Sequence, residues 1–507
     1  MSDERRRTNP HLRLRYRAIF SYTGLILTIC AGLMLVPIAC AIFWPAELRL
    51  AYGFIIPSLA LALLGMGLWR YFCPGQAVSL TIQQGSVIVV LGWILVSLAS
   101  ALPFVLVEGM DYTHGLFEAV SGWTTTGLSV VDVTRASHMT LLWRSLMQLA
   151  GGAGLAIIMI ASIAGPSGIG LSAAEGRGEQ LVPHVRASVK LVLTLYAGYA
   201  SVGIIAYWIA GMSLFDAINH SFCAVATGGF STRPENIGAW NEVRIEAVTI
   251  PLMLLGNLNF LTAWTLVRRR FGDAARSGEL RLIAVVIPLA ALLLYALVAV
   301  PIYGAGGYGA RVAIFETVSA LTGTGFTIVN YGIWNGFGIL VVVVLMCIGG
   351  GAGSTSGGIK QYRIYVLLKS LAWEVRRAFL PPSAIAERYI WRGDHKDFID
   401  DRRLRAVAEY AFLYIVALIV ATLVISASGF GLQESVFEAA SMIGTVGLSA
   451  GITAPTMAPA VLWTGIIGML LGRLEFYVVI VGLVKLLSDA RKMLIPRPVA
   501  SDTSDSS

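Results

Sequence analysis

Long apolar runs recur along the whole chain and restrict it to one kind of environment. Several runs, such as 18–43, 87–107 and 191–210, approach or exceed the ~20 apolar residues that a helix needs to cross ~30 Å of hydrocarbon. Apolar residues make up 56% of the 507 residues and charged residues only 13%, so a water-exposed surface would be far too apolar. We therefore expect an all-α polytopic membrane protein in a lipid bilayer. The candidate spans are 18–43, 52–72, 85–107, 139–164, 190–211, 245–267, 281–303, 336–368, 406–428 and 458–486.

Lysine and arginine are distributed unevenly between the segments that join these spans. If the N-terminus lies in the cytoplasm, the segments expected on that side hold 30 of the 37 basic residues. This asymmetry obeys the positive-inside rule and predicts that both termini are cytoplasmic. Topology and contact with anionic lipid then explain the net charge of +8, which does not predict a nucleic-acid partner.

Four stretches of similar sequence lie between spans, each on the side predicted to face outward. Their key glycines are 102, 96 and 122 residues apart, too far for a solenoid. Each repeat crosses the membrane twice, so all four repeats keep the same orientation, as parallel repeats around an axis along the membrane normal would. Four like units around one axis predict a central pathway. The stretches are FEAVSGWTTTGLS (117–129), FDAINHSFCAVATGGFS (215–231), FETVSALTGTGFT (315–327) and FEAASMIGTVGLS (437–449).

Each stretch predicts a short helix that enters the membrane from outside and then a tight loop. An acid precedes the key glycine by nine residues in stretches one, three and four, and by thirteen in stretch two. We expect these acids in the first helical turn, where a carboxylate complements the positive helix end, and the simplest interpretation is that they only start the helices. The acids are Glu118, Asp216, Glu316 and Glu438.

The loop of each stretch ends in a triplet of small residues that exposes its backbone. Extended backbone at membrane depth is tolerated only where it is buried in protein or lines a wet cavity. Because glycine permits positive φ, four such loops can direct carbonyl oxygens at one centre and replace the hydration shell of a cation. Simple helix packing by Thr and Gly is the alternative. The triplets are Thr125-Thr126-Gly127, Thr227-Gly228-Gly229, Gly323-Thr324-Gly325 and Thr445-Val446-Gly447.

A glycine-rich segment, GGGAGSTSGG (349–358), interrupts the span that follows the third stretch. It holds six glycines in ten residues, and each destabilises a helix by ~1 kcal/mol relative to alanine, so the span should break there. A phosphate-binding loop is excluded because Ile359 separates Gly358 from Lys360. An unwound segment below the loops is placed to close or open the pathway, and a kink that serves packing alone is the alternative.

The last predicted span carries an arginine in the sequence GRLEFY (472–477). A charge inside a membrane is costly and by default marks function. Arg473 lies only two residues from Glu475 and would face another side of a helix, so carbonyl groups of the glycine-rich segment are its expected partners. Pairing with an acid for assembly is the alternative. We expect Arg144, in WRS, to be an interfacial anchor.

These features together resemble the Trk-type (TrkH) potassium uptake proteins of the wider Trk, Ktr and HKT superfamily. The likeness covers nearly the whole chain, from an extra N-terminal pair of spans through four units of span, pore loop and span. The resemblance implies a K⁺ selectivity filter made by the four triplets, with K⁺ as the transported ion and no tightly bound cofactor. It also implies a homodimer with one pore in each subunit, a cytoplasmic nucleotide-binding partner of the TrkA type, and the cell inner membrane as location.

The resemblance also assigns an intramembrane gating loop and shows two departures from the family pattern. Gly323 and Val446 replace the threonines of other triplets, which makes the predicted filter uneven and Na⁺ less safely excluded. The fourth stretch resembles the Ktr branch, so a Ktr-like Na⁺-dependent K⁺ transporter is an alternative. Gating residues by resemblance are Gly351, Gly353, Ser354, Thr355, Gly357, Gly358 and Arg473, with Lys360 either gating or satisfying topology.

The same pattern predicts the domain organisation. The connector 371–405 either docks the partner or is a solvated link. The predicted units are a basic N-terminus (1–17), the N-terminal pair of spans (18–80), pore repeats 81–170, 171–275, 276–370 (with the gating loop at 347–360) and 406–492, the connector, and a cytoplasmic tail (493–507).

Two other functional classes compete with a cation pathway. A membrane enzyme is disfavoured because an HExxH motif is absent from the sequence and the six histidines are scattered along it. A secondary transporter that rocks two halves around a small solute would favour broken helices in corresponding positions of both halves. The sequence predicts a break in one repeat only, which argues against that class.

Overall fold

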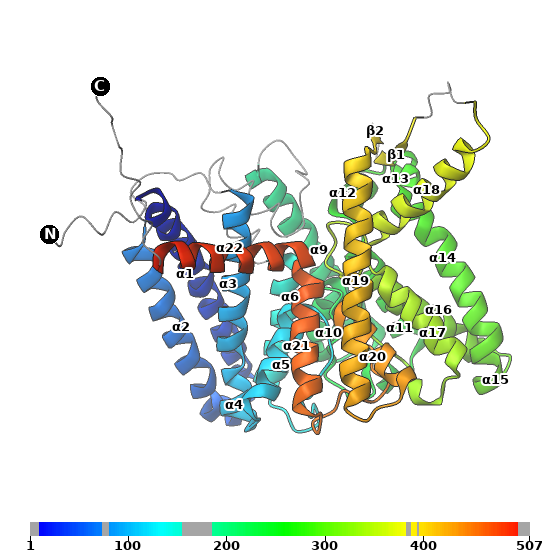
Figure 1. Cartoon of the computed structure of the whole chain (residues 1–507). Coiled ribbons are helices and arrows are strands. Elements are labelled where there is room, and N and C mark those ends of the chain that lie inside the picture. Colours follow the sequence, from blue (N-terminus) through cyan, green and yellow to red (C-terminus); the bar gives the residue numbers. More distant parts are fainter. Residues whose placement is uncertain (1–9, 74–80, 155–184, 382–386, 393–394, 495–507) are drawn as a thin grey trace, which may run out of the picture.

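The computed structural model describes residues 10–73, 81–154, 185–381, 387–392 and 395–494, and these are mostly helical (Figure 1). The strands among the described residues form one hairpin, in which β1 (Tyr389–Arg392) pairs antiparallel with β2 (His395–Phe398). The predicted all-α fold class is therefore confirmed.

The N-terminal helices pack tightly against each other. Helix α1 (Pro10–Leu35) continues into the 3₁₀ turn η2 (Val36–Ile42), and α2 (Tyr52–Tyr71) returns beside it after η3 (Pro45–Leu50). A Cβ built at Gly24 or at Gly65 would overlap the opposite backbone. Glycine at this crossing lets the two backbones approach closely, as small residues do at helix contacts in membranes.

Four successive groups of helices follow, each with an outer helix, a short helix and an inner helix. The outer helices are α3 (Ile82–Ser100) with α4 (Leu102–Glu108), α9 (Val185–Ala210), α14 (Gly278–Leu294) with the π turn η6 (Tyr295–Ala299) and α15 (Val300–Tyr303), and α19 (Asp401–Ala427). The short helices are α5 (Tyr112–Trp123), α10 (Leu214–Val225), α16 (Gly307–Thr322) and α20 (Leu432–Gly444). The inner helices begin with α6 (His138–Ala153), α11 (Val243–Asn257), α17 (Gly336–Ile348) and α21 (Pro459–Leu474).

The inner helices are interrupted in more than one group. Helix α17 ends at the glycine-rich segment and the chain resumes as α18 (Gln361–Arg377), as the sequence predicts. Helix α11 also stops, and α12 (Phe260–Val267) follows after two residues. The prediction that a helix breaks in one repeat only is therefore wrong, and it no longer disfavours a rocking transporter. The predicted span 139–164 runs past residue 154 and lies partly outside the described residues.

The last predicted span, 458–486, is also broken. Helix α21 ends at Leu474, and α22 (Phe476–Leu494) leaves at an angle of 102°, so it lies crosswise to α21 in Figure 1. The residue between them, Glu475, has φ +61°, which no α-helix accommodates. Its carboxylate accepts a hydrogen bond from Arg363 Nη2 (2.7 Å) on α18, and this ion pair supports the bend.

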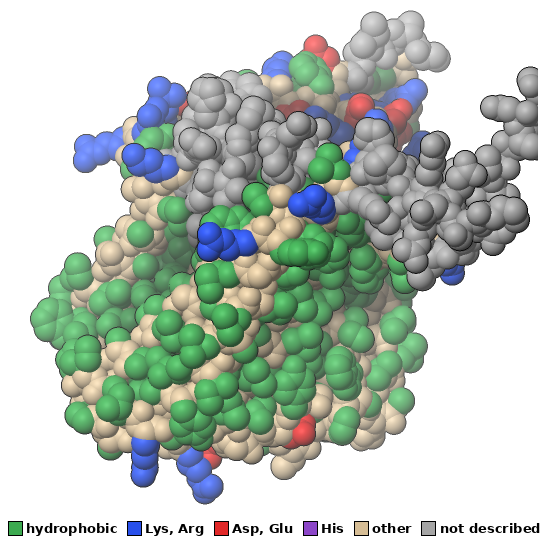
Figure 2. Space-filling view, turned by 90° about the vertical axis from the view of Figure 1, so that its left-hand side faces the viewer, with side chains coloured by type: hydrophobic (Ala, Val, Ile, Leu, Met, Phe, Trp, Pro, Cys, Tyr) green, Lys and Arg blue, Asp and Glu red, His purple; other side chains and the backbone are tan. Residues whose placement is uncertain are grey.

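The surface of the helices is suited to lipid. Among the described residues six helices are long and apolar enough to cross a membrane, with a seventh if the bent pair counts as one span. Large apolar side chains are exposed on them, for example Leu63 (69%) and Ile209 (75%). Figure 2 shows apolar side chains across the middle of one face and basic side chains at its two ends. The chain is thus a multi-pass membrane protein.

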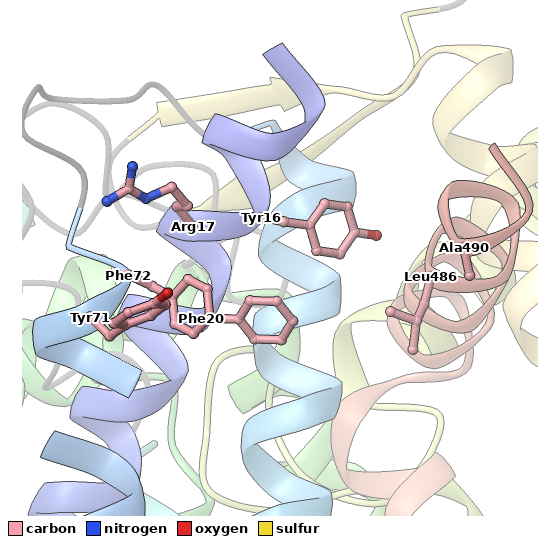
Figure 3. A pocket seen from close by; sticks show the side chains of 7 residues that line it. All are labelled: Tyr16, Arg17, Phe20, Tyr71, Phe72, Leu486 and Ala490. Carbon is pink, nitrogen blue, oxygen red and sulfur yellow. The ribbon is translucent and has the colours of Figure 1, made fainter. Parts of the chain in front are cut away.

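A pocket of about 810 Å³ lies between α1, α2 and α22 (Figure 3). Its walls are mainly aromatic and aliphatic, with one arginine, and they contain no residue of the triplets or of the glycine-rich segment. The pocket therefore belongs to the N-terminal helices and not to the candidate pathway. Its lining residues are Tyr16, Arg17, Phe20, Tyr71, Phe72, Leu486 and Ala490.

Short helices and loops outside these groups complete the described chain. They are η5 (Asn236–Ala239), α13 (Phe271–Arg276) and η7 (Tyr331–Ile333).

Candidate functional site

The four triplets meet around one centre and are here called the triplet ring. A Cβ built at each key glycine would overlap the carbonyl oxygen of the middle residue of the next triplet, so only glycine permits this approach. The contacts run from the first triplet to the second, third and fourth and back to the first, which closes the ring. The pairs are Gly127 with Gly228, Gly229 with Thr324, Gly325 with Val446, and Gly447 with Thr126.

The backbone of every triplet has the same unusual conformation. The first and third residues have positive φ, and three of the first residues are threonines, for which this region is rarely occupied. In the third triplet a glycine stands at this first position, where it adopts positive φ without strain. The φ values are +56° at Thr125, +51° at Thr227, +65° at Gly323 and +50° at Thr445, and +93°, +74°, +78° and +102° at the key glycines.

The end of each short helix sets this conformation. The amide of the middle triplet residue donates to a carbonyl one turn back, at distances of 2.8 to 3.1 Å. In the first and fourth repeats the key glycine amide also donates to a serine hydroxyl, Ser121 or Ser441, at 3.0 Å. These bonds satisfy polar groups at the helix terminus and direct the chain into the ring. The four amide bonds join Thr126 to Ser121, Gly228 to Cys223, Thr324 to Ser319 and Val446 to Ser441.

The sequence interpretation expected all four acids in the first turn of the short helices. Only Asp216 lies there, in α10, and the other three lie further along their helices. Helix α5 begins one turn earlier than expected because Asp111 caps it by accepting from the Thr113 amide (2.9 Å), a bond that also lowers the pKa of the Asp111 carboxyl. Glu118 instead accepts from Ser129 Oγ and the Val130 amide, both at 2.9 Å, on the chain that leaves the ring.

The acids of the third and fourth repeats hold the outgoing chain in the same way. Glu316 accepts from the hydroxyl of Thr327 (3.0 Å) and the Ile328 amide (2.8 Å). Glu438 accepts from Ser449 Oγ (2.8 Å) and the Ala450 amide (3.2 Å). Both side chains are fully buried, so each carboxylate depends on these donors to replace water.

The second repeat uses a histidine in this position, which the sequence interpretation missed. His220 precedes Gly229 by nine residues, the spacing of the other acids, and its Nε2 lies 2.9 Å from Ser231 Oγ. Its Nδ1 lies 2.8 Å from the Asp216 carbonyl oxygen, which can only accept, so Nδ1 carries the proton and Nε2 accepts from the serine. The spacing of nine residues from the key glycine is the sequence signal that could have identified His220.

Arg144 is buried at the ring and is not the interfacial anchor that the sequence suggested. Its side chain is 2% exposed, and Nε donates to Glu118 (2.7 Å). Nη1 donates to the Ser231 carbonyl oxygen (3.0 Å) and Nη2 to Ser129 Oγ (2.8 Å), while the guanidinium lies 4.1 Å from the centre of the Phe230 ring. Arg144 thus connects the chains that leave the first and second triplets.

The glycine-rich segment reaches the first residue of every triplet through residues 355–357. The Thr355 carbonyl oxygen accepts from Thr125 Oγ1 (3.3 Å), and the Thr355 hydroxyl lies 2.9 Å from that of Thr227. A Cβ built at Gly323 would overlap Ser356 Oγ, and one built at Gly357 would overlap Thr445 Oγ1, so the segment also lies close to the third and fourth triplets. This segment therefore covers one opening of the triplet ring.

The remaining residues of the glycine-rich segment anchor it to neighbouring helices. The Gly351 amide donates to the Asn257 carbonyl oxygen (3.1 Å), and the Ala352 amide donates to Glu279 (2.7 Å) on α14. The other predicted gating residues in the segment contact its own backbone or a nearby side chain. Ser354 donates to the Gly351 carbonyl oxygen (2.7 Å), Gly353 (φ +73°) lies near Asn259, Gly358 packs on Gly349, and Lys360 (φ +82°) is buried at the start of α18.

Arg473 links the glycine-rich segment to the first inner helix. Its Nη1 donates to the Thr355 carbonyl oxygen (2.5 Å) and its Nη2 to the Gly151 carbonyl oxygen (2.6 Å). This contact agrees with the expectation that carbonyl groups of the segment receive Arg473. The carboxylate of Glu475 pairs with Arg363 instead. A positive charge therefore lies beside the residues that cover the ring.

Comparisons with known proteins agree over nearly the whole chain. A family model described as "TrkH: Cation transport protein" matches residues 54–493. The Trk system potassium uptake protein TrkG of Escherichia coli K12 is 30% identical over 486 residues, 92% of this chain and 97% of that protein. An uncharacterized cation transporter of Methanocaldococcus jannaschii is 28% identical over 471 residues, 91% and 94% of the two chains. The crystal structure of the potassium transporter TrkH from Vibrio parahaemolyticus has a TM-score of 0.78 at 26% identity and covers 93% of this chain and 98% of that chain.

Proposed function

This chain belongs to the TrkH family of cation transport proteins, and from that premise we propose that it takes up potassium across the inner membrane through the triplet ring. The resemblance drawn from the sequence is thereby confirmed, and because the relatives are transport proteins the chain is not an enzyme. The observation that carries the proposal is the closed order of contacts in which each key glycine faces the carbonyl of the next triplet.

The triplet ring is the proposed selectivity filter. Carbonyl oxygens from four sides can replace the water around K⁺, and buried backbone of this kind is tolerated where it lines a cation pathway. The hydroxyls of Thr125, Thr227 and Thr445 add oxygen atoms at one end of the ring. The third triplet lacks this hydroxyl because Gly323 stands there, so we expect weaker Na⁺ exclusion than four identical triplets would give.

The glycine-rich segment is the proposed gate. Residues 355–357 lie against all four triplets, and Arg473 holds Thr355 by a charge-assisted hydrogen bond. A cation that leaves the ring on this side meets both a physical barrier and a positive charge. We propose that conduction requires this segment to move away and the contact between Arg473 and Thr355 to break.

A cytoplasmic subunit of the TrkA type is the proposed regulator, and the chain is proposed to act as a homodimer with one pore in each subunit. Both termini and the connector 371–405 would then face the cytoplasm, where the exposed side chains of Arg376 and Arg377 on α18 and of Lys396 in the hairpin are available to a partner. Support comes from the relatives named as Trk system proteins.

Potassium uptake by a transport-deficient bacterial strain tests the proposal. With a TrkA-type subunit supplied, the wild-type chain is expected to restore growth at low K⁺, and purified protein in liposomes is expected to carry K⁺ or Rb⁺. Flux should be measured with and without Na⁺, because strict Na⁺ dependence would favour the Ktr-like alternative suggested by the fourth stretch. Absence of K⁺ flux from folded protein in both assays would reject the proposal.

A further inference from the structure

The second triplet differs from the others at its middle residue. The other three triplets carry a branched side chain there, namely Thr126, Thr324 and Val446, whereas the second carries Gly228. A Cβ built at Gly228 would overlap the side-chain amide of Gln148, a fully buried residue on α6 of the preceding repeat. The carboxamide of Gln148 thus fills the space that a side chain at position 228 would need.

Gln148 also makes two hydrogen bonds to this triplet and the residue after it. Its Nε2 donates to the Gly228 carbonyl oxygen (2.6 Å), and its Oε1 accepts from the Phe230 amide (3.3 Å). The same Gly228 carbonyl closes on Gly127 in the ring. One side chain therefore fixes the orientation of a carbonyl that belongs to the proposed filter.

The inner helices show that an amide at this position is a departure from the repeat. Gly151, Gly256 and Gly472 each pack against the carbonyl of the residue two before a triplet, so they lie at equivalent places on α6, α11 and α21. The residues three positions before these glycines are Gln148, Met253 and Met469. All three are fully buried, but the methionines cannot donate a hydrogen bond to a carbonyl.

A second amide holds the same triplet from its other end. Asn236 Nδ2 donates to the carbonyl oxygen of the key glycine Gly229 (3.1 Å), and Asn236 Oδ1 accepts from the Ile237 amide (2.8 Å), which fixes the carboxamide. Among the residues that the structure describes, no side chain donates to the carbonyls of the other key glycines. The second triplet therefore has two consecutive carbonyls held by amide donors.

We propose that Gln148 and Asn236 are positioning residues that set the K⁺ over Na⁺ preference of the ring by holding the carbonyls of Gly228 and Gly229. This inference rests on the proposed function. A carbonyl that is free to tilt can follow a smaller ion inward, and a donor on its second lone pair resists that tilt and favours the larger ion. Rigid carbonyls in one quarter of the ring offset the unevenness introduced by Gly323 and Val446.

The test compares variants that remove each donor with a matched control. Gln148→Met installs the residue that α11 and α21 carry, and Asn236→Gly removes the amide while tolerating the positive φ of this position (+57°). The control is Asn330→Gly, because Asn330 bonds only the Gly332 amide (2.8 Å) after the third triplet. The measurement is the K⁺/Na⁺ permeability ratio in liposomes, which does not depend on how much protein is active.

We expect each donor variant to lower this ratio about fivefold, the scale of one net hydrogen bond, and the control to keep the wild-type ratio. Gly228→Ala alone should lose K⁺ flux by collision with Gln148, and Gly228→Ala with Gln148→Ala should regain flux at a reduced ratio. Wild-type ratios in both Gln148→Met and Asn236→Gly would overturn the inference while leaving the proposed function intact. A wild-type protein that carries no K⁺ would instead reject the proposed function. If Gln148→Met does not fold, the partly exposed Asn236 still decides the result.

Discussion

His220 occupies in the second repeat the place that Glu118 occupies in the first. Each precedes its key glycine by nine residues, and each accepts a hydrogen bond, of 2.9 Å, from the hydroxyl of the serine two residues after that glycine. A neutral imidazole and a carboxylate thus perform the same structural task. The acid of the second repeat, Asp216, lies one helical turn before His220 and accepts hydrogen bonds from Thr232 Oγ1 (2.6 Å) and Arg233 Nη2 (3.1 Å).

Replacing His220 by leucine should destabilise the fold, because the buried Ser231 hydroxyl loses its acceptor. We expect His220→Leu to lower the free energy of unfolding by about 1–3 kcal/mol. The thermal unfolding midpoint of detergent-solubilised protein measures this change. His114→Gln is the control, since His114 contacts Asp111 near the surface, and its midpoint should stay close to wild type. Equal midpoints for the two variants would contradict the role assigned to His220.

Removing Arg144 should be more damaging, because it leaves the buried Glu118 carboxylate without its cation. We expect Arg144→Met to cost about 3–5 kcal/mol, and Arg144→Met with Glu118→Gln to recover part of that loss. The same unfolding assay tests both variants. Arg233→Ala provides the comparison, since Arg233 is 53% exposed in its pair with Asp216, and it should cost no more than about 1 kcal/mol. If the double variant is less stable than Arg144→Met, the loss of stability does not come from an unpaired Glu118 carboxylate.

A methyl group at a key glycine should disrupt ion passage at the ring. Gly325→Ala places its Cβ against the Val446 carbonyl oxygen, so we expect K⁺ flux in liposomes to fall at least tenfold or the K⁺/Na⁺ ratio to collapse. Gly109→Ala is the matched control: Gly109 also has positive φ (+67°), but a Cβ there meets no atom within 4 Å. Unaltered flux ratios in Gly325→Ala would show that the ring does not select ions.

Loss of the Arg473 side chain should open the proposed gate. Arg473→Ala removes the hydrogen bond to the Thr355 carbonyl, and a bond from a charged donor contributes enough to raise basal K⁺ flux about tenfold. Flux should be measured in liposomes without any regulatory subunit. Arg376→Ala, on the exposed surface of α18, is expected to keep the wild-type flux. Reduced or unchanged flux in folded Arg473→Ala protein would favour a packing role for this residue.

The sequence was sufficient to predict the membrane fold and to identify the four triplets. Apolar runs report burial in lipid directly, and the glycines recur because no other residue fits the close approach seen at Gly127 and Gly325. The break after α17 was also predictable, since six glycines in ten residues cannot maintain a helix. These features depend on local chemistry that a single sequence displays.

The features that sequence reasoning missed depend on contacts between distant segments. The bend falls at Glu475, which is neither glycine nor proline, and it is supported by Arg363, 112 residues away. The position of Arg144 near the start of a predicted span suggests an interfacial anchor, but its hydrogen-bond partners lie on two different loops. The acid in the second repeat was matched by residue type, whereas spacing from Gly229 would have selected His220.

Because one polypeptide supplies all four sides of the ring, a single codon change alters a quarter of it. In an assembly of identical subunits the same change would strike every side at once. Natural variation can therefore change the four triplets one at a time, and the triplets of this chain already differ at Gly228, Gly323 and Val446.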